Sequence, residues 1–180
     1  MSDIFKHLFG GWREADARRW KNPDGSEGGI VAISANVDPS VTLPADVVVW
    51  PDAKIMKGVA SIGYGASIGY GASIGDGASI GYGASIGDGA RYDDGDWLFV
   101  AGPQGSRNAW ATAVWSPKHG LRWWVGCQHG ITTETLRKRV EREHGASDHG
   151  DDYRHLINTV EHHPGLARAM AAASAKQAAE

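Results

Sequence analysis

The sequence has little of several features that usually point to a function. One cysteine among 180 residues excludes an internal disulfide and agrees with a reducing compartment. No apolar run reaches eighteen residues, and no basic segment followed by an apolar one opens the chain. We therefore expect a soluble cytoplasmic protein that does not enter a membrane. A net charge of only −3 argues against a general surface for nucleic acid.

Glycine, by contrast, is abundant, and much of it lies in a repeat. Ten consecutive units run from Val31 to the fifth position of the last unit, Ala90. Their spacing is six residues, except for one unit of seven at 55–61. Each unit opens with a large aliphatic residue: Val31, Val37, Leu43, Val49, Ile55, Ile62, Ile68, Ile74, Ile80 and Ile86. A fixed short period is typical of a solenoid, in which each unit buries its apolar side against its neighbours.

The fifth position of each unit is small and apolar, from Ala35 to Ala90. One large and one small inward residue in every six fit neither a helix nor an alternating strand, and they favour a short strand followed by a bend. Three such units would make one triangular coil, with about three and a half coils in all, roughly 16 Å tall at the usual strand spacing. A disordered glycine-rich tract would not need aliphatic residues at fixed places.

In these ten units the chain resembles the bacterial hexapeptide-repeat family of left-handed parallel β-helix proteins. The resemblance covers about a third of the chain. Residues 20–29, Trp-Lys-Asn-Pro-Asp-Gly-Ser-Glu-Gly-Gly, also resemble the opening of hexapeptide proteins common in bacteriophage genomes. The family resemblance implies a homotrimer in a bacterial host cell and, for many members, an acyltransferase that uses acetyl-CoA.

We therefore predict a mainly β fold with three parts: an N-terminal cap or lead-in at 1–30, a left-handed β-helix at 31–92, and a C-terminal α+β module at 93–180. Within the first part, residues 3–9 could form a short helical turn, whereas 12–20 fit a helix or a strand. Residues 1–30 are available to cover the first coil, since an open solenoid end would expose its core and unpaired strand edges.

The C-terminal module is predicted to combine a three-strand antiparallel meander with helices. Turn signals around Pro103 and Pro117 separate strand candidates at 97–101, 109–116 and 121–128. Thr132 or Thr133 is expected to cap a helix that ends near Glu143. A polar link at 147–152 then leads to helices at about 153–162 and 166–179, with a break at Pro164.

The repeat lacks the residue types on which catalysis in such proteins usually depends. An acyltransferase needs a general base, and a carbonic-anhydrase relative needs three histidine ligands, yet no histidine or cysteine occurs between Val31 and Tyr92. Seven of the eight histidines follow residue 118, without a familiar metal-ligand spacing. We assign no catalytic residue, metal or cofactor, although an acetyl-CoA acyltransferase with its base in the C-terminal module stays open.

The third position of each unit is predicted to point outward at a corner. Residues eighteen apart, or nineteen where the seven-residue unit intervenes, then form three columns. The columns are Ala45, Tyr64 and Tyr82; Pro51, Tyr70 and Asp88; and Lys57, Asp76 and Asp94. Adjacent coils lie about 4.8 Å apart, close enough for Tyr64 to stack on Tyr82 and for Lys57 to offset the repulsion between the aspartates. This regular edge could contact a partner, or it could simply keep the prism soluble.

A second candidate lies at 122–130, where a strand end runs into a helix start and backbone N–H groups can face an anion. Cys127 fits a buried structural cysteine better than a thiolate nucleophile. Trp123 and Trp124 fit core or interface positions better than a stacking platform. The candidate binding residues are Tyr64, Tyr70, Asp76, Tyr82, Asp88, Arg122, Trp124 and His129.

These observations favour a non-catalytic homotrimeric β-helix protein that binds another protein. If the chain is phage-encoded, that partner would be a host protein, such as one of a defence system, or another phage protein. Two alternatives remain: the acetyl-CoA-dependent acyltransferase, and a protein that holds a nucleotide or metabolite between protomers without converting it.

Overall fold

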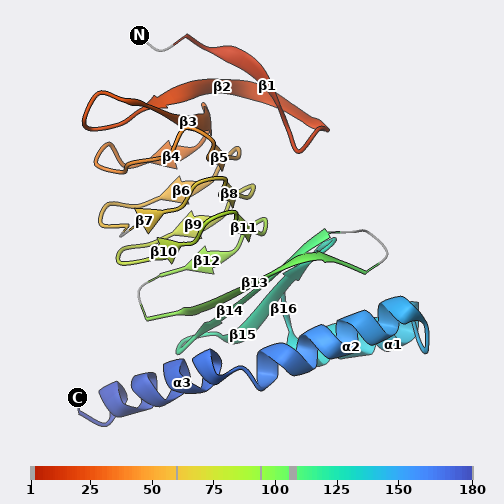
Figure 1. Ribbon diagram of the computed structural model, residues 1–180. Coiled ribbons are helices and arrows are strands. Elements are labelled where there is room, and N and C mark those ends of the chain that lie inside the picture. The colour runs from red at the N-terminus through yellow and green to blue at the C-terminus, as the bar shows by residue number, and fades with distance from the viewer. Residues whose placement is uncertain (1–2, 60, 94, 106–108, 180) are drawn as a thin grey trace. The chain divides into compact units, whose positions relative to one another are not determined.

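The protein is mainly β, with three helices after its last strand (Figure 1). The computed structural model describes residues 3–59, 61–93, 95–105 and 109–179. The chain divides into two units, Met1–Asp94 and Gly95–Glu180, each with its own sheets. In the part of the chain that the structure describes, no helix is long and apolar enough to cross a membrane.

A β-hairpin opens the first unit. Strand β1 (Phe5–Phe9) pairs antiparallel with β2 (Arg13–Lys21), and β2 pairs antiparallel with β3 (Glu27–Ala32). The predicted helical turn at 3–9 is wrong, because alternate residues of β1 face inward: Phe9 is buried and His7 half-buried, whereas Leu8 is exposed. A period of two belongs to a strand, and pairing with β2 stabilises it.

Strand β3 also begins the solenoid. Nine two-residue strands follow it: β4 (Asn36–Val37), β5 (Val48–Val49), β6 (Lys54–Ile55), β7 (Ser61–Ile62), β8 (Ser67–Ile68), β9 (Ser73–Ile74), β10 (Ser79–Ile80), β11 (Ser85–Ile86) and β12 (Arg91–Tyr92). Parallel pairing stacks them as β3-β5-β8-β11, β4-β6-β9-β12 and β7-β10. The chain therefore forms a β-solenoid of about three turns (Figure 1).

The inside of the solenoid is filled as the spacing predicts. All ten large aliphatic residues are buried, and the most accessible of them, Val37, is only 7% exposed. Of the small fifth-position residues, Ala35, Val59 and Ala84 are half-buried and the others are buried. The aliphatic column thus forms a continuous apolar core, which stabilises the stack because each coil removes its neighbours' apolar surface from water.

The end of β2 and the turn that follows it satisfy polar backbone groups of the solenoid's first coil. Asn22 is buried, and its side chain both accepts from Leu43 N (2.8 Å) and donates to Leu43 O (3.1 Å). The Trp20 Nε1–H donates to Val41 O at 2.9 Å. Val41 and Leu43 lie outside the regular strands, so these side chains supply hydrogen bonds that a sheet neighbour would otherwise provide.

Gly69 and Gly81 both follow the large aliphatic residue of their units, but the stacked coils leave different space around them. A Cβ on Gly69 would lie 2.5 Å from Ile86 O, whereas a Cβ on Gly81 would meet nothing within 4 Å. We expect Gly69→Ala to lower the free energy of unfolding by about 1–3 kcal/mol. Gly81→Ala should change it by less than about 0.5 kcal/mol. Urea denaturation followed by circular dichroism measures both, and equal losses would contradict this packing.

The second unit contains a four-stranded antiparallel sheet, not the three-stranded meander that the sequence predicted. Its strands follow chain order: β13 (Trp97–Gln104), β14 (Ala109–Ser116), β15 (Gly120–Val125) and β16 (Gln128–Thr132). The region predicted as one strand at 121–128 is a hairpin, because Gly126 has a φ of +57° and ends β15. Pairing resumes at once, with Val125 opposite Gln128.

Three helices complete this unit: α1 (Thr133–Glu143), α2 (Asp148–Glu161) and α3 (Pro164–Gln177). Helix α1 begins and ends as predicted, with Thr132 accepting a hydrogen bond from Thr135 N. The predicted link at 147–152 is wrong, since Ser147 caps α2 by accepting from Gly150 N. Pro164 opens α3, where its missing N–H costs nothing.

One face of this sheet packs against α1 and α2. The buried residues between them are Ala111, Ala113, Trp123, Val125, Leu136, Val140, Tyr153, Leu156, Ile157 and Val160. They come from strands β14 and β15 and from the helices, so the helices cover these two central strands.

Candidate functional site

Two of the predicted corner columns can be followed in the backbone. The N–H of Gly71 donates to Pro51 O, and that of Gly89 donates to Tyr70 O at 2.8 Å. The Asp88 carboxylate accepts from Tyr70 N at 2.9 Å, which fixes this residue directly beneath Tyr70. In the neighbouring column Gly83 N donates to Tyr64 O. Residues eighteen apart, or nineteen across the seven-residue unit, therefore lie one above another at these corners.

The remaining members of the columns differ in what they contact. Tyr64 and Tyr82 are 61% and 85% exposed, and no ring contact between them occurs among the residues described. Asp76 places its carboxylate over Gly58, where a Cβ would lie 1.8 Å from Oδ1. Asp94 lies outside the described residues. Tyr70, in the remaining column, contacts a side chain from the N-terminal hairpin.

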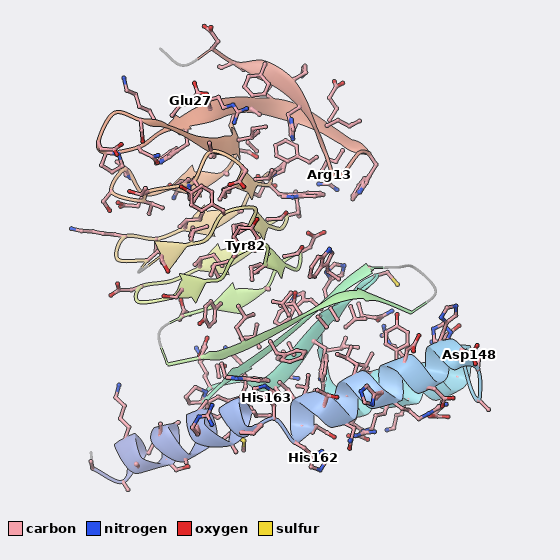
Figure 2. The ribbon with its side chains drawn as sticks, viewed as in Figure 1. Arg13, Glu27, Tyr82, Asp148, His162 and His163 are labelled. Atoms are coloured by element: carbon pink, nitrogen blue, oxygen red, sulfur yellow. The ribbon has the colours of Figure 1, made fainter. Side chains whose placement is uncertain are left out.

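The sequence did not predict that the N-terminal hairpin would reach this column. The Arg13 guanidinium carbon lies 4.4 Å from the centroid of the Tyr70 ring and 5.2 Å from that of Trp12. Arg13 stands at the start of β2, beside the turn that joins β1 to β2 (Figure 2). A cation over aromatic faces at these distances is attracted by the ring quadrupoles.

Trp50 supports the hairpin turn from the corner after β5. Its ring centroid lies 6.1 Å from Trp12 and 5.7 Å from Phe9, and its Nε1–H donates to Ser67 Oγ at 3.0 Å. Gly10 packs so closely on Trp50 that a Cβ would lie 2.6 Å from the indole ring. Trp50 is therefore fixed on both sides, and it orients Trp12, which remains 65% exposed.

A carboxylate completes this arrangement. A hydrogen bond to the Asp52 side chain and the negative charge of that carboxylate raise the pKa of Tyr70, while Arg13 opposes the shift. Asp52 is the one described non-glycine residue with a positive φ, and its N–H donates to Ser34 Oγ at 3.1 Å. We call Trp12, Arg13, Trp50, Asp52 and Tyr70 the Tyr70 patch.

The Tyr70 patch combines side chains that can make stacking and ionic contacts. It offers aromatic faces, one guanidinium and one carboxylate, but no serine, cysteine or histidine among its five residues. Nowhere in the described ranges do three or more histidine, cysteine, aspartate or glutamate residues come together to hold a metal ion. Sequence reasoning found Tyr70 and the adjacent Asp88. It missed Trp12, Arg13, Trp50 and Asp52, because no periodic pattern encodes how the hairpin turn packs on the corner after β5. The abundance of tryptophan, eight in 180 residues, was a signal of such a surface.

The predicted residues of the second unit lie on the paired strands β15 and β16. Arg122 and Trp124 lie on β15, on the face opposite Trp123, and both are half-buried. His129 is exposed on β16. Cys127 was predicted to be buried and is exposed, because β15 ends at Val125 and the cysteine stands in the turn beyond it.

Comparison of the chain with models of protein families, with curated proteins and with solved structures finds no match.

Proposed function

We propose that this chain is a non-catalytic binding protein and that the Tyr70 patch contacts a protein partner. The observation that carries the proposal is the Arg13 guanidinium held over the Tyr70 ring beside a Trp12 side chain that is mostly exposed. Tryptophan, tyrosine and arginine are the residues enriched at the energetic centres of protein interfaces. An arginine that served only to keep the surface soluble would not need to be held over two aromatic rings.

The scaffold suits this role. Tyr70 is attached to a coil whose backbone is hydrogen-bonded to the coils above and below, through Gly71 N to Pro51 O and Gly89 N to Tyr70 O. Trp50 is anchored to Ser67. Side chains that are ordered before binding lose less conformational entropy in the complex, so their contacts contribute more to affinity.

The six-residue period supports a more detailed proposal. We assign the solenoid to the left-handed parallel β-helices of the hexapeptide-repeat type, assembled as a homotrimer without a cofactor. The resemblance at 20–29 supports a phage-encoded protein that acts in the cytoplasm of a bacterial host, on a host defence protein or another phage protein. Native mass spectrometry tests the assembly, for which three times the chain mass of 19.2 kDa is expected.

Affinity capture from bacterial lysate tests the binding function. The chain with Trp12→Ala should retain the captured partner about 30-fold less tightly than the unaltered chain, as for an interface residue worth about 2 kcal/mol. Tyr82→Ala is the matched control, because it removes an aromatic side chain that is 85% exposed on the same solenoid. Quantitative mass spectrometry followed by calorimetry with the purified partner measures the difference.

Two outcomes would contradict this proposal. One is a partner that binds the Trp12→Ala and Tyr82→Ala variants with the same affinity as the unaltered chain. The other is turnover of acetyl-CoA together with a melting temperature that rises in its presence, which would indicate an acyltransferase.

A further inference from the structure

A cavity of about 410 Å³ lies in the second unit, between the β15–β16 turn and helices α1 and α2. Its volume falls within the range of about 300–1,000 Å³ typical of small-molecule sites. Its most buried lining residues are apolar or aromatic: Val125, Leu136, Val140 and Tyr153 are each at most 6% exposed. The cavity therefore has a buried apolar floor, made by side chains that also belong to the unit's core.

The rim of this cavity is polar. It includes the exposed Cys127, the half-buried Arg139 and His144, and the ion pair of Arg142 with Glu143 at 2.7 Å. The His144 ring stacks on Tyr153, with centroids 5.5 Å apart, which fixes one wall. Polar groups around an apolar floor orient a ligand that has both kinds of surface.

Arg139 differs from the other basic residues of α1. Arg137 pairs with Glu161, Lys138 with Glu134, and Arg142 with Glu143. The nearby carboxylates of Glu141 and Asp151 both pair with Arg154 on α2. Within the described part of the chain, Arg139 has no carboxylate partner. Arg139 therefore borders the cavity without an ion pair of its own, on the same helix as the Arg142–Glu143 pair.

The helix macrodipole does not account for Arg139. A basic residue is most favourable in the last turn of a helix, where carbonyl groups are unpaired. On α1 that residue is Arg142. Arg139 lies one turn earlier, half-buried beside an apolar surface, where the charge is less well solvated and an anion would be attracted more strongly than in open water.

We infer that this cavity binds a small organic carboxylate with an apolar or aromatic body. The carboxylate would pair with the Arg139 guanidinium, whose planar fork matches two carboxylate oxygens. The body would lie on the floor formed by Leu136, Val140 and the Tyr153 ring. The inference is independent of the Tyr70 patch, which lies in the first unit.

The single cysteine provides a reporter for this site in the full chain. Cys127 is exposed at the rim, so a bound ligand should slow its alkylation by iodoacetamide, a neutral reagent. With 1-naphthoate as the probe, we expect the alkylation rate to fall as the probe concentration rises to about 10 mM, which covers the range of weak sites. The neutral 1-naphthamide should protect Cys127 about tenfold less well.

Two matched variants test whether Arg139 is the residue that pairs with the carboxylate of the probe. Arg139→Gln should weaken protection by 1-naphthoate about tenfold and leave protection by 1-naphthamide unchanged. Arg168→Gln, which removes an exposed arginine on α3 outside the cavity, should change neither. Circular dichroism confirms that the variants are folded, and the two probes alone test the inference in the unaltered chain.

The inference is overturned if 1-naphthoate fails to protect Cys127 at these concentrations. Equal protection by the acid and the amide would also overturn it, because the site would then recognise only an apolar body. So would equal protection by 1-naphthoate in the unaltered chain and in Arg139→Gln.

Discussion

Replacing Trp123 with alanine is expected to lower the free energy of unfolding of the second unit by about 3–5 kcal/mol, the usual cost of removing a buried aromatic side chain. Trp123 has no exposed surface, and it lies among residues of β14, α1 and α2. Its Nε1–H donates to Thr133 Oγ1 at 2.9 Å, at the first residue of α1. The substitution removes both core volume and this link between the sheet and the helix.

The neighbouring tryptophan is the natural control. Trp124 lies on the opposite face of β15 and is half-buried, so Trp124→Ala should cost less than half as much. Trp123→Phe, which keeps an aromatic ring but removes the hydrogen bond, should give an intermediate loss. Guanidinium denaturation followed by near-ultraviolet circular dichroism measures all three, and equal losses for the two alanine variants would contradict the assignment of faces.

The solenoid was predictable because its signal is repeated. Ten aliphatic residues at a fixed spacing identify the inward position, and no single misplaced residue could hide the period. The hairpin before it has no such repetition. Residues 3–9 contain too few alternating positions to separate a strand from a helical turn, and the pairing of Phe5 with Ala17 that decides the matter is a long-range contact.

In the second unit, a single glycine accounts for the missed strand. The segment 121–128 alternates well enough to suggest one long strand, and a glycine at an interior position is compatible with that reading. Only the backbone conformation of Gly126, with φ of +57°, shows that the chain reverses there. The same turn carries Cys127 to the surface, so one error produced two wrong predictions.

The candidate sites were less predictable than the fold. The eighteen-residue spacing correctly places Asp88 beneath Tyr70, because that relation follows from the period. The approach of Arg13 and Trp12 depends on how the hairpin turn packs against Trp50, which no periodic pattern encodes. No sequence pattern predicts that Arg139 lacks an ion pair either, because this depends on which carboxylates pair with the other basic residues of α1.

In the first unit, Ile68→Ala is expected to lower the free energy of unfolding by about 2–5 kcal/mol. Ile68 has no exposed surface and lies in register between Val49 and Ile86 in the stacked strands. The coils on either side are held by the hydrogen bonds from Trp50 N to Ile68 O and from Gly69 N to Ile86 O, both 2.9 Å. Because this ladder limits collapse around the missing atoms, the loss should fall in the upper half of that range.

Two further variants separate core packing from a general effect of substitution in the repeat. Ile68→Val removes one methylene group and should cost about 0.5–1.5 kcal/mol. Tyr82→Ala removes far more atoms, but its side chain is 85% exposed and the stability should change by less than about 0.5 kcal/mol. Urea denaturation measures the series. If Tyr82→Ala lowered the free energy of unfolding as much as Ile68→Ala, burial of the aliphatic column could not be the main source of the solenoid's stability.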